Sequence, residues 1–261
     1  MHPLVNIGIK AAREGGRLLM RAFDERLPLH IESKSKHDYV TQYDKAVEEI
    51  ILKTILKAYP HHSIQSEECG EMTGHDEITW IIDPIDGTTN FIHGFPQFCI
   101  SIAVKERGQI EHGIIYDPIR DELFTASRGH GAQLNHRRMR VSNTKHLDEA
   151  LLGTGFPFRE TPILNNYIKV LQTLFTQASG IRRAGAAALD LAYVAAGRLD
   201  GFWEYGLKDW DFAAASLMIQ EAGGSVTTFN GDKKILGEKT ILASNLKIHE
   251  ALQDIISKAF N

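Results

Sequence analysis

The stretch 80–91 restricts the possible fold of this chain more than any other part of the sequence does. It reads WIIDPIDGTTNF, so three residues of strand character run directly into Asp83 and Pro84. Proline fixes φ and cannot donate to a sheet ladder, so the strand is predicted to end there. Asp86 follows, Gly87 frees the backbone, and the next two threonines can cap a helix. The stretch predicts either an ordinary turn or a loop with two carboxylates and free N–H groups.

The first half of the chain offers further acidic residues that could share a site with these two. Asp44 and Thr41 have the Thr-x-x-Asp spacing of a capping box before a second helix, and capping alone would explain Asp44. Glu67 and Glu68 follow a short strand. Adjacent carboxylates are normally solvated, but directly after a strand one of the two must point inward.

The second half adds Asp211 and Glu204. Asp211 is predicted at a helix start, where a carboxylate interacts favourably with the helix dipole, and Trp210 beside it would shield a site. Glu204 ends the preceding predicted strand and points toward the same loop region, with a surface glutamate as the alternative. Mg²⁺ prefers carboxylate and carbonyl oxygens, and phosphate prefers the N–H groups of a helix N-terminus. These residue types together favour a site for a metal and a phosphate.

The overall composition excludes several classes of protein. Of the 261 residues, 43% are hydrophobic and 24% charged, as in an ordinary globular protein. The net charge of -4 gives no basis for general nucleic-acid binding. Cys69 and Cys99 cannot form a disulfide framework or a zinc site by themselves, and Cys99 is expected to be buried. Lys10 and Arg13 interrupt any signal-peptide core, and no apolar run reaches the length of a membrane span. We therefore expect a cytoplasmic protein that contacts no membrane.

Hydrophobic periodicity predicts a different organisation in the two halves. Helices are expected over residues 4–23 and from Thr41 to Pro60. Short strands are expected at 30–32 and 63–65. Strands at 98–104, 110–116 and 121–126 and a hairpin at 129–135 are expected to join through short turns into an antiparallel sheet. Beyond residue 141, strands at 151–156, 201–205, 225–229 and 240–243 alternate with helices at 164–175, 186–196, 210–222 and 248–260. We expect one compact unit with an α+β lobe at 1–140, holding most metal ligands, and an α/β lobe at 141–261, holding the substrate pocket.

The acidic segments resemble the signatures of a known family. DPIDGTTNF at 83–91 is similar to the first signature of the inositol monophosphatase family, and WDFAA at 210–214, running to EAGG at 221–224, is similar to the second. The segments at 38–44 and 66–68 fall where that family has its other acidic residues. The match covers nearly the whole chain in register. Segments 153–158 and 189–198 are most similar to bacterial members of the extragenic-suppressor type.

This resemblance implies an α/β fold, an αβαβα layered sandwich of the inositol monophosphatase and fructose-1,6-bisphosphatase type. It also implies a homodimer that hydrolyses small phosphomonoesters with two to three Mg²⁺ ions and is sensitive to Li⁺. The first ion would be held by Glu67, Asp83 and the carbonyl of Ile85. The second would be held by Asp83, Asp86 and Asp211, so that Asp83 bridges the two.

The same resemblance implies roles in catalysis and substrate binding. Glu67 and Thr88, the latter oriented by Asp44, would position and deprotonate the attacking water. Glu204 matches the residue with which inositol phosphatases bind a ring hydroxyl. The full set of implied substrate contacts is Gly87, Thr88, Gly185, Ala186, Ala187, Glu204 and Asp211.

The implied activity is Mg²⁺-dependent hydrolysis of inositol-1-phosphate to inositol and phosphate. A broader sugar-phosphate or nucleotide phosphatase, acting on fructose-1,6-bisphosphate or 3′-phosphoadenosine 5′-phosphate, is the alternative. A non-catalytic role as a partner of the transcription antitermination machinery is a third. The chain departs from the family at Lys208, where animal members often have His. A segment one residue shorter than in many relatives leaves Lys34 or Lys36 as the lysine at the pocket rim.

Two basic segments stay open to two interpretations. Residues 136–140 are expected to form an exposed basic turn, with a partner site as the alternative. Arg182 and Arg183 precede the predicted pocket helix and are either solvated or at a subunit contact. Because arginine is favoured at interfaces, we expect at least one of them at the dimer contact, coupled to the geometry of Gly185 and Ala186.

Overall fold

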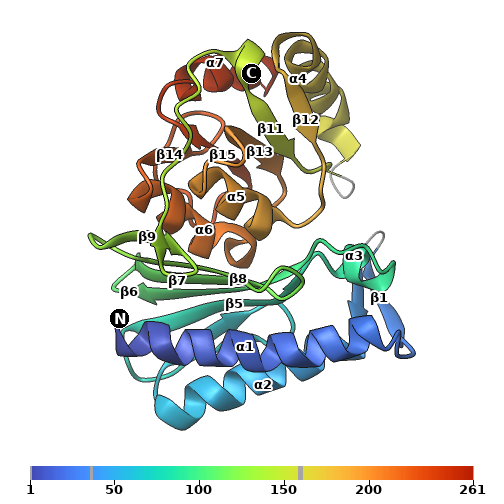
Figure 1. The fold of residues 1–261 in the computed structure, drawn as a ribbon, viewed down its shortest axis with the longest axis vertical. Coiled ribbons are helices and arrows are strands. Elements are labelled where there is room, and N and C mark those ends of the chain that lie inside the picture. Colours follow the sequence, from blue (N-terminus) through green and yellow to red (C-terminus); the bar gives the residue numbers. More distant parts are fainter. Residues whose placement is uncertain (1, 36–37, 158–160, 261) are drawn as a thin grey trace.

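The computed structural model describes residues 2–35, 38–157 and 161–260 and shows five layers. A pair of helices covers one face of a large sheet, two helices lie between this sheet and a second, smaller one, and a further pair covers the outer face of the second sheet (Figure 1). This is the αβαβα layered sandwich that the sequence predicted.

The first layer consists of α1 (Pro3–Asp24) and α2 (Gln42–Ala58), close to the predicted bounds. Proline at the first position of α1 needs no N–H partner there, and the buried side chains lie on one face. Small residues let α1 approach the sheet closely. A Cβ added to Gly16 would lie 2.5 Å from the ring of Tyr116, so a larger residue there would push the helix away.

Among the described residues, the larger sheet has eight strands in the order β10-β9-β8-β7-β6-β5-β3-β4. Neighbouring strands are antiparallel except β3 and β5, which are parallel. The strands are β3 (Ser63–Ser66), β4 (Gly70–Met72), β5 (Ile78–Asp86), β6 (Cys99–Glu106), β7 (Gln109–Asp117), β8 (Glu122–Ser127), β9 (Gly131–Leu134) and β10 (Arg137–Arg138). Their apolar side chains pack on α1 and α2 on one face and on α6 (Asp209–Glu221) on the other.

The predicted end of strand β5 at Pro84 is wrong. The strand runs on to Asp86, and Pro84 is accommodated because the pairing with β6 shifts its register between Asp83 and Asp86. The two carboxylates therefore belong to one buried strand end. The threonines do not cap the following helix α3 (Thr88–Ile92). Gly87 takes the capping position with φ 97°, a conformation that favours glycine.

The second sheet has five strands in the described part of the chain, ordered β12-β11-β13-β15-β14. It is mixed, because β11 pairs in parallel with β12 and β13, whereas β15 is antiparallel to β13 and β14. The strands are β11 (Leu151–Thr154), β12 (Gly180–Arg182), β13 (Gly201–Tyr205), β14 (Gly224–Thr227) and β15 (Thr240–Asn245). The central helices are α5 (Ala187–Ala195) and α6 (Asp209–Glu221), and the outer ones are α4 (Leu164–Gln177) and α7 (His249–Phe260).

Smaller elements complete the fold. The single short strand expected at 30–32 is one arm of a hairpin, β1 (Ile31–Ser35) with β2 (Asp38–Thr41). Two single turns of 3-10 helix lie at Leu147–Glu149 and Thr161–Ile163. In the parts of the chain that the structure describes, no helix is long and apolar enough to cross a membrane.

Candidate active site

One cavity of ≈ 710 Å³ lies where the end of β5 meets the N-terminal ends of α5 and α6. It is called the site pocket below. It is lined by nearly all residues that the sequence singled out, namely Glu67, Asp83, Ile85, Asp86, Gly87, Thr88, Gly185, Ala186, Ala187, Glu204 and Asp211. Asp44 does not line it and lies behind Thr88. The fold thus brings together residues from both halves of the chain.

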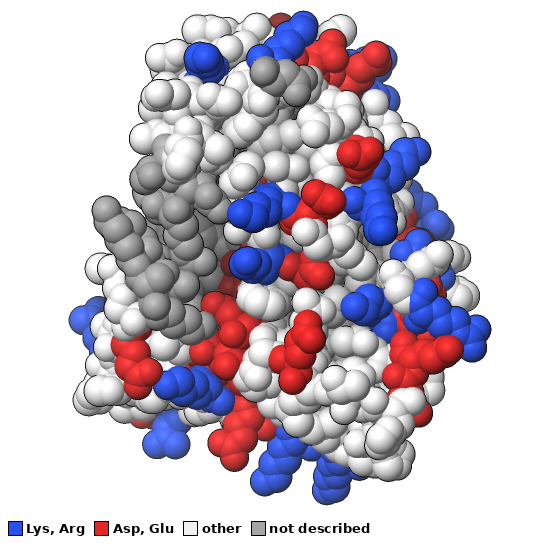
Figure 2. All heavy atoms as spheres, turned by 180° about the vertical axis from the view of Figure 1, so that it is seen from behind, with Lys and Arg blue, Asp and Glu red and all other residues white. Residues whose placement is uncertain are grey.

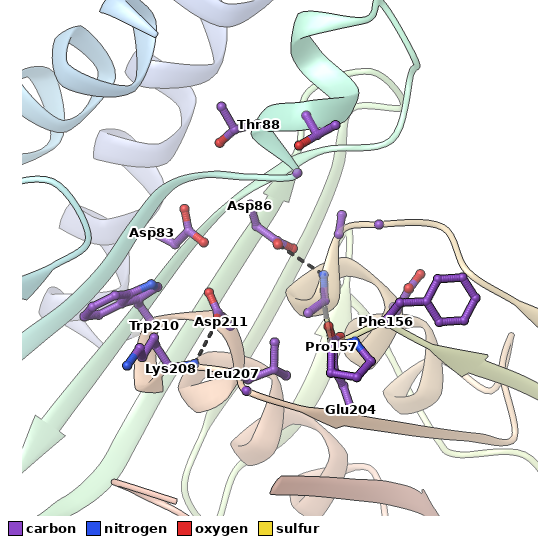
Figure 3. A pocket seen from close by; sticks show the side chains of 18 of the residues that line it. Asp83, Asp86, Thr88, Phe156, Pro157, Glu204, Leu207, Lys208, Trp210 and Asp211 are labelled. Carbon is purple, nitrogen blue, oxygen red and sulfur yellow. Dashed lines mark hydrogen bonds between the residues drawn. The ribbon is translucent and has the colours of Figure 1, made fainter. Parts of the chain in front are cut away.

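Asp83 is the most enclosed carboxylate of the site pocket. Its side chain is 2% exposed, and its Oδ1 accepts a hydrogen bond of 2.9 Å from the N–H of Ile85. Burial raises the pKa of Asp83 well above its ordinary value, and the nearby carboxylates of Glu67, Asp86, Asp211 and Asp44 raise it further. The carboxylates around Asp83 therefore give this part of the site an excess of negative charge. In Figure 3 the carboxylates of Asp83, Asp86 and Asp211 are directed toward the same space.

Asp86 joins the two halves of the molecule. Its carboxylate accepts hydrogen bonds from the backbone N–H groups of Ala187 (3.1 Å), Ala188 (2.8 Å) and Leu189 (3.4 Å) at the start of α5. Figure 3 marks one of these bonds with a dashed line. Burial raises the pKa of Asp86 to about 6, although these N–H groups oppose the rise. Cys99 is buried, as predicted, with its sulfur 3.6 Å from Oδ2 of Asp86. No sequence pattern signalled this link to α5, because it joins residues about 100 positions apart.

Asp44 both caps α2 and orients Thr88, so the capping role and the role at the site are compatible. Its Oδ2 accepts from the N–H and the hydroxyl of Thr41, at 2.7 Å each, and its Oδ1 accepts from the hydroxyl of Thr88 at 3.0 Å. The carbonyl of Ile85 lies 2.9 Å from the same Thr88 hydroxyl. Burial raises the pKa of Asp44, and the hydrogen bonds from Thr41 and Thr88 lower it in part.

Glu48, which the sequence did not point to, holds the residues on both sides of Glu67. Glu48, in α2, is 5% exposed, and its Oε1 accepts hydrogen bonds from the Ser66 hydroxyl and from the N–H of Glu68 at 3.1 Å. The backbone of Glu67 itself donates to the carbonyl of Ile82 at 3.2 Å. The signal in the sequence was a glutamate next to the apolar face of a helix.

Asp211 lies in the first turn of α6, as predicted. Its Oδ2 accepts a 2.7 Å hydrogen bond from the N–H of Lys208, which fixes its orientation toward the pocket (Figure 3). Trp210 lines the same wall, and its carbonyl accepts from the Ser101 hydroxyl at 3.2 Å. Lys208, where the sequence departs from the family pattern, also lines the site pocket.

Glu204 lies at the end of β13 and remains partly exposed through the pocket. Burial raises its pKa well above the ordinary value; Asp211 adds to the rise and Arg183 opposes it. A Cβ added to Gly155 would lie 1.9 Å from Oε1 of Glu204, so only glycine leaves room for this carboxylate. Arg183 also lines the pocket, with its guanidinium 5.6 Å from the ring centre of Phe156.

The remaining sequence predictions fall in different places. Arg182 is exposed on β12, which is an edge strand of the second sheet, so of the two arginines it is the one directed away from the pocket. Of the predicted basic turn at 136–140, Arg137 and Arg138 are exposed as expected, but they form strand β10, and Met139 beside them is buried. Lys36 lies outside the described residues, as does the side chain of Lys34, so the rim lysine stays unassigned. Figure 2 shows basic and acidic side chains intermixed over the face that it presents.

The donor atoms of the site pocket fit a hard divalent cation. They are carboxylate and carbonyl oxygens, which Mg²⁺ prefers, and the raised pKa of Asp83 reflects a repulsion that a cation would relieve. Among the described residues, no three acidic, histidine or cysteine side chains lie close enough together to form a complete ligand cluster. The hydrogen bonds of Asp86 to α5 and of Asp211 to Lys208 fix the orientation of these two carboxylates.

Comparison with known proteins gives consistent matches over the whole chain. The model of the inositol monophosphatase family matches residues 1–260. The Nus factor SuhB of Pseudomonas aeruginosa is 52% identical over 257 residues, covering 97% of this chain and 95% of that protein. The extragenic suppressor protein SuhB of Bartonella henselae superposes with a TM-score of 0.95 at 45% identity, covering 98% of this chain and 99% of that one. The inositol monophosphatase of Anabaena superposes with a TM-score of 0.86 at 38% identity, covering 98% and 95%.

Proposed function

This chain belongs to the inositol monophosphatase family and is a metal-dependent phosphatase, and we propose that its substrate is inositol-1-phosphate. The observation that carries the proposal is the position of Glu204. It shares the site pocket with the carboxylates around Asp83, so one pocket can hold a phosphate at one wall and a hydroxyl-bearing group at another. A carboxylate that accepts from a hydroxyl favours substrates that carry one.

The acidic residues divide into two proposed metal sites. Glu67, Asp83 and the carbonyl of Ile85 would hold one Mg²⁺, Asp83, Asp86 and Asp211 a second, and Glu67 would contribute to a weaker third. Bound Mg²⁺ would supply Lewis-acid stabilisation of the phosphate charge and would lower the pKa of water. Inhibition by Li⁺ belongs to the same proposal.

The residues of the chain would then perform the proton and positioning chemistry. The hydroxyl of Thr88 has one proton and two acceptors in reach, Asp44 and the carbonyl of Ile85, so a lone pair of its oxygen stays free to accept from water. Thr88 would thus orient the attacking water, and Glu67 would remove its proton. The N–H groups of Gly87 and Thr88, at the start of α3, would bind the phosphate. Asp211, and the backbone of Gly185, Ala186 and Ala187, would contact the alcohol.

A second role has one observation in its favour. The relative from Pseudomonas aeruginosa, with 52% identity, is named a Nus factor. We propose on this likeness that the chain can also join the transcription antitermination machinery, and that it acts as a homodimer, as its family resemblance implies.

The test of the substrate is phosphate release with and without Mg²⁺. The substrates are inositol-1-phosphate, fructose-1,6-bisphosphate and 3′-phosphoadenosine 5′-phosphate. The proposal predicts the highest kcat/KM for inositol-1-phosphate and no release without a divalent cation. A higher kcat/KM for either bisphosphate would contradict it and would favour the broader phosphatase.

A further inference from the structure

Asp190, in the first turns of α5, is a second carboxylate on the wall of the site pocket that carries Glu204. It is 2% exposed and lines the pocket. Burial and then the carboxylate of Asp86 raise the pKa of Asp190. Asp190 in turn contributes to the raised pKa of Glu204, and Arg183 opposes the rise for both. Neither the family signatures nor the spacing of acidic residues in the sequence pointed to Asp190.

No described residue donates a hydrogen bond to the side chain of Asp190, which is unusual for so enclosed a carboxylate. The other buried aspartates of the site each have donors: Asp83 accepts from Ile85, and Asp86 accepts from three N–H groups of α5. In the described part of the chain, Trp203 Nε1 is the one sealed side-chain polar atom without a partner. The oxygens of Asp190 are therefore not sealed, and they open into the pocket that the residue lines.

A purely structural role explains Asp190 poorly. A carboxylate in the first turn of a helix can stabilise the helix dipole, but Asp86 already accepts from the first N–H groups of α5. An enclosed carboxylate without a hydrogen-bond donor destabilises the folded state, since its charge is desolvated and the distant charge of Arg183 supplies no hydrogen bond. The helix around it is otherwise apolar, with alanine and leucine at most buried positions. A donor supplied by a ligand would remove that penalty.

We propose that Asp190 is a specificity-determining residue that accepts a hydrogen bond from a hydroxyl of the substrate alcohol. With Glu204, whose pKa it helps to raise, it forms what we call the acidic wall of the site pocket. The inference rests on the proposed function, because it concerns the alcohol of a phosphate monoester. It narrows the substrate class to monophosphates of alcohols with several hydroxyl groups. The acidic wall repels a second phosphate at the same position.

The test compares kcat/KM for inositol-1-phosphate and for para-nitrophenyl phosphate, which lacks hydroxyls, in the Mg²⁺-loaded protein. Asp190→Asn keeps the shape and removes the charge. We expect it to lower kcat/KM for inositol-1-phosphate about 10- to 100-fold and to change that for para-nitrophenyl phosphate less than about threefold. The melting temperature should stay equal or rise, because a desolvated charge is removed. Hydrolysis of fructose-1,6-bisphosphate should rise relative to that of inositol-1-phosphate.

The matched control is Asp200→Asn in the same half of the molecule. Asp200 is also buried, but its Oδ2 accepts a 2.7 Å hydrogen bond from the N–H of Leu151, so its role is structural. This variant should lower the melting temperature and leave the ratio of the two kcat/KM values unchanged. Asp190→Ala serves as the second variant, because alanine favours a helix. Its ratio of kcat/KM for inositol-1-phosphate to kcat/KM for para-nitrophenyl phosphate should fall as much as that of Asp190→Asn.

The outcomes separate this inference from the proposed function. Equal losses on both substrates, an unchanged ratio, or a melting temperature as low as that of Asp200→Asn for both Asp190 variants would overturn the role of Asp190. A wild-type protein that does not prefer inositol-1-phosphate over the bisphosphates would instead overturn the proposed substrate. The first result leaves the phosphatase intact, and the second is visible before any variant is made.

Discussion

Replacing Glu48 tests how the protein holds Glu67 in place. The carboxylate of Glu48 accepts from the residues on both sides of Glu67, the Ser66 hydroxyl and the Glu68 N–H, through the same oxygen, Oε1. Glu48→Leu removes both hydrogen bonds, so the Ser66 hydroxyl and the Glu68 N–H lose this acceptor. Hydrogen bonds to charged groups contribute about 1.5–3 kcal/mol each, and Ser66 keeps a contact with the carbonyl of Ile82 at 3.3 Å. The expected loss in the free energy of unfolding is therefore about 2–4 kcal/mol.

Two matched variants make this magnitude checkable. Glu48→Gln retains a carbonyl oxygen at the position of Oε1, so it should lose about 1 kcal/mol or less. Glu49→Leu lies next to it on the exposed side of α2 and should change the stability by no more than about 0.5 kcal/mol. The assay is urea unfolding without metal, followed by phosphate release over a range of Mg²⁺ concentrations.

The activity should follow the position of Glu67. Glu48→Leu should lower kcat and raise the Mg²⁺ concentration needed for half-maximal rate, because Glu67 is proposed to hold metal and to take a proton from water. Glu48→Gln should stay close to wild type in both. The reasoning is refuted if Glu48→Leu is as stable as Glu49→Leu, or if it keeps wild-type Mg²⁺ dependence despite the loss of stability.

Three further predictions concern other parts of the molecule. Glu204→Gln should lower kcat/KM for inositol-1-phosphate more than for para-nitrophenyl phosphate, and equal losses in the two assays would assign Glu204 a structural role. Arg182→Ala should weaken self-association in sedimentation. An unchanged dissociation constant would indicate that this edge-strand arginine is solvated and lies outside the dimer contact. His112, stacked on His2 with ring centres 4.4 Å apart, has its pKa lowered to about 4, first by burial and then by the charges of His2 and His130. The unfolded chain therefore binds a proton that the folded one does not, so stability should fall from pH 6.5 toward pH 4, by at most about 3 kcal/mol for this residue. The melting temperature of His112→Gln should accordingly depend less on pH in this range than that of wild type, and parallel curves would count against the explanation.

The elements with long, regular periodicity could be predicted from the sequence. The helices α1 and α2 lie close to their predicted positions, and β13 has the predicted bounds, because their apolar side chains repeat at 3.6 or 2 residues. The short strand β4 was missed, since its three residues are exposed and carry no apolar pattern. Its pairing with β3 alone holds it in the sheet.

The end of β5 shows where a local rule fails. Proline normally ends a central strand, yet β5 continues past Pro84 because the register shift removes the need for a ladder hydrogen bond there. Sequence alone could not give this shift, which depends on how β6 pairs on either side of it. The same shift brings Asp83 and Asp86 to neighbouring positions in the pocket.

The site residues found from the sequence are those that the family resemblance covers, in the two signatures and at the other matching positions. Glu48 and Asp190 were missed because their roles come from packing: Glu48 contacts a loop about 20 residues away, and Asp190 reaches the pocket only once α5 packs under β11. A weak signal existed for both. Glu48 is an acidic residue beside the apolar face of α2, and Asp190 is one within an otherwise apolar stretch of α5, where an unpaired charge is costly. Arg183, one of the two arginines of which at least one is expected at a subunit contact, also lines the site pocket, and that contact stays a prediction.

The central claim is that the carboxylates around Asp83 hold the metal ions with which this phosphatase acts. Asp83→Asn tests it most directly, because it keeps the shape of the side chain and removes charge where four other carboxylates converge. The variant should still fold. Without metal, its melting temperature should equal or exceed that of wild type, since like-charge repulsion is relieved.

The measurement is turnover of inositol-1-phosphate by Asp83→Asn and wild type at saturating Mg²⁺, with Mg²⁺ binding followed by calorimetry on the same samples. We predict a loss of kcat on the order of a thousandfold, which corresponds to about 4 kcal/mol of transition-state stabilisation, and weaker Mg²⁺ binding. Turnover near the wild-type rate by a folded Asp83→Asn protein would contradict the assignment of these carboxylates as the metal site.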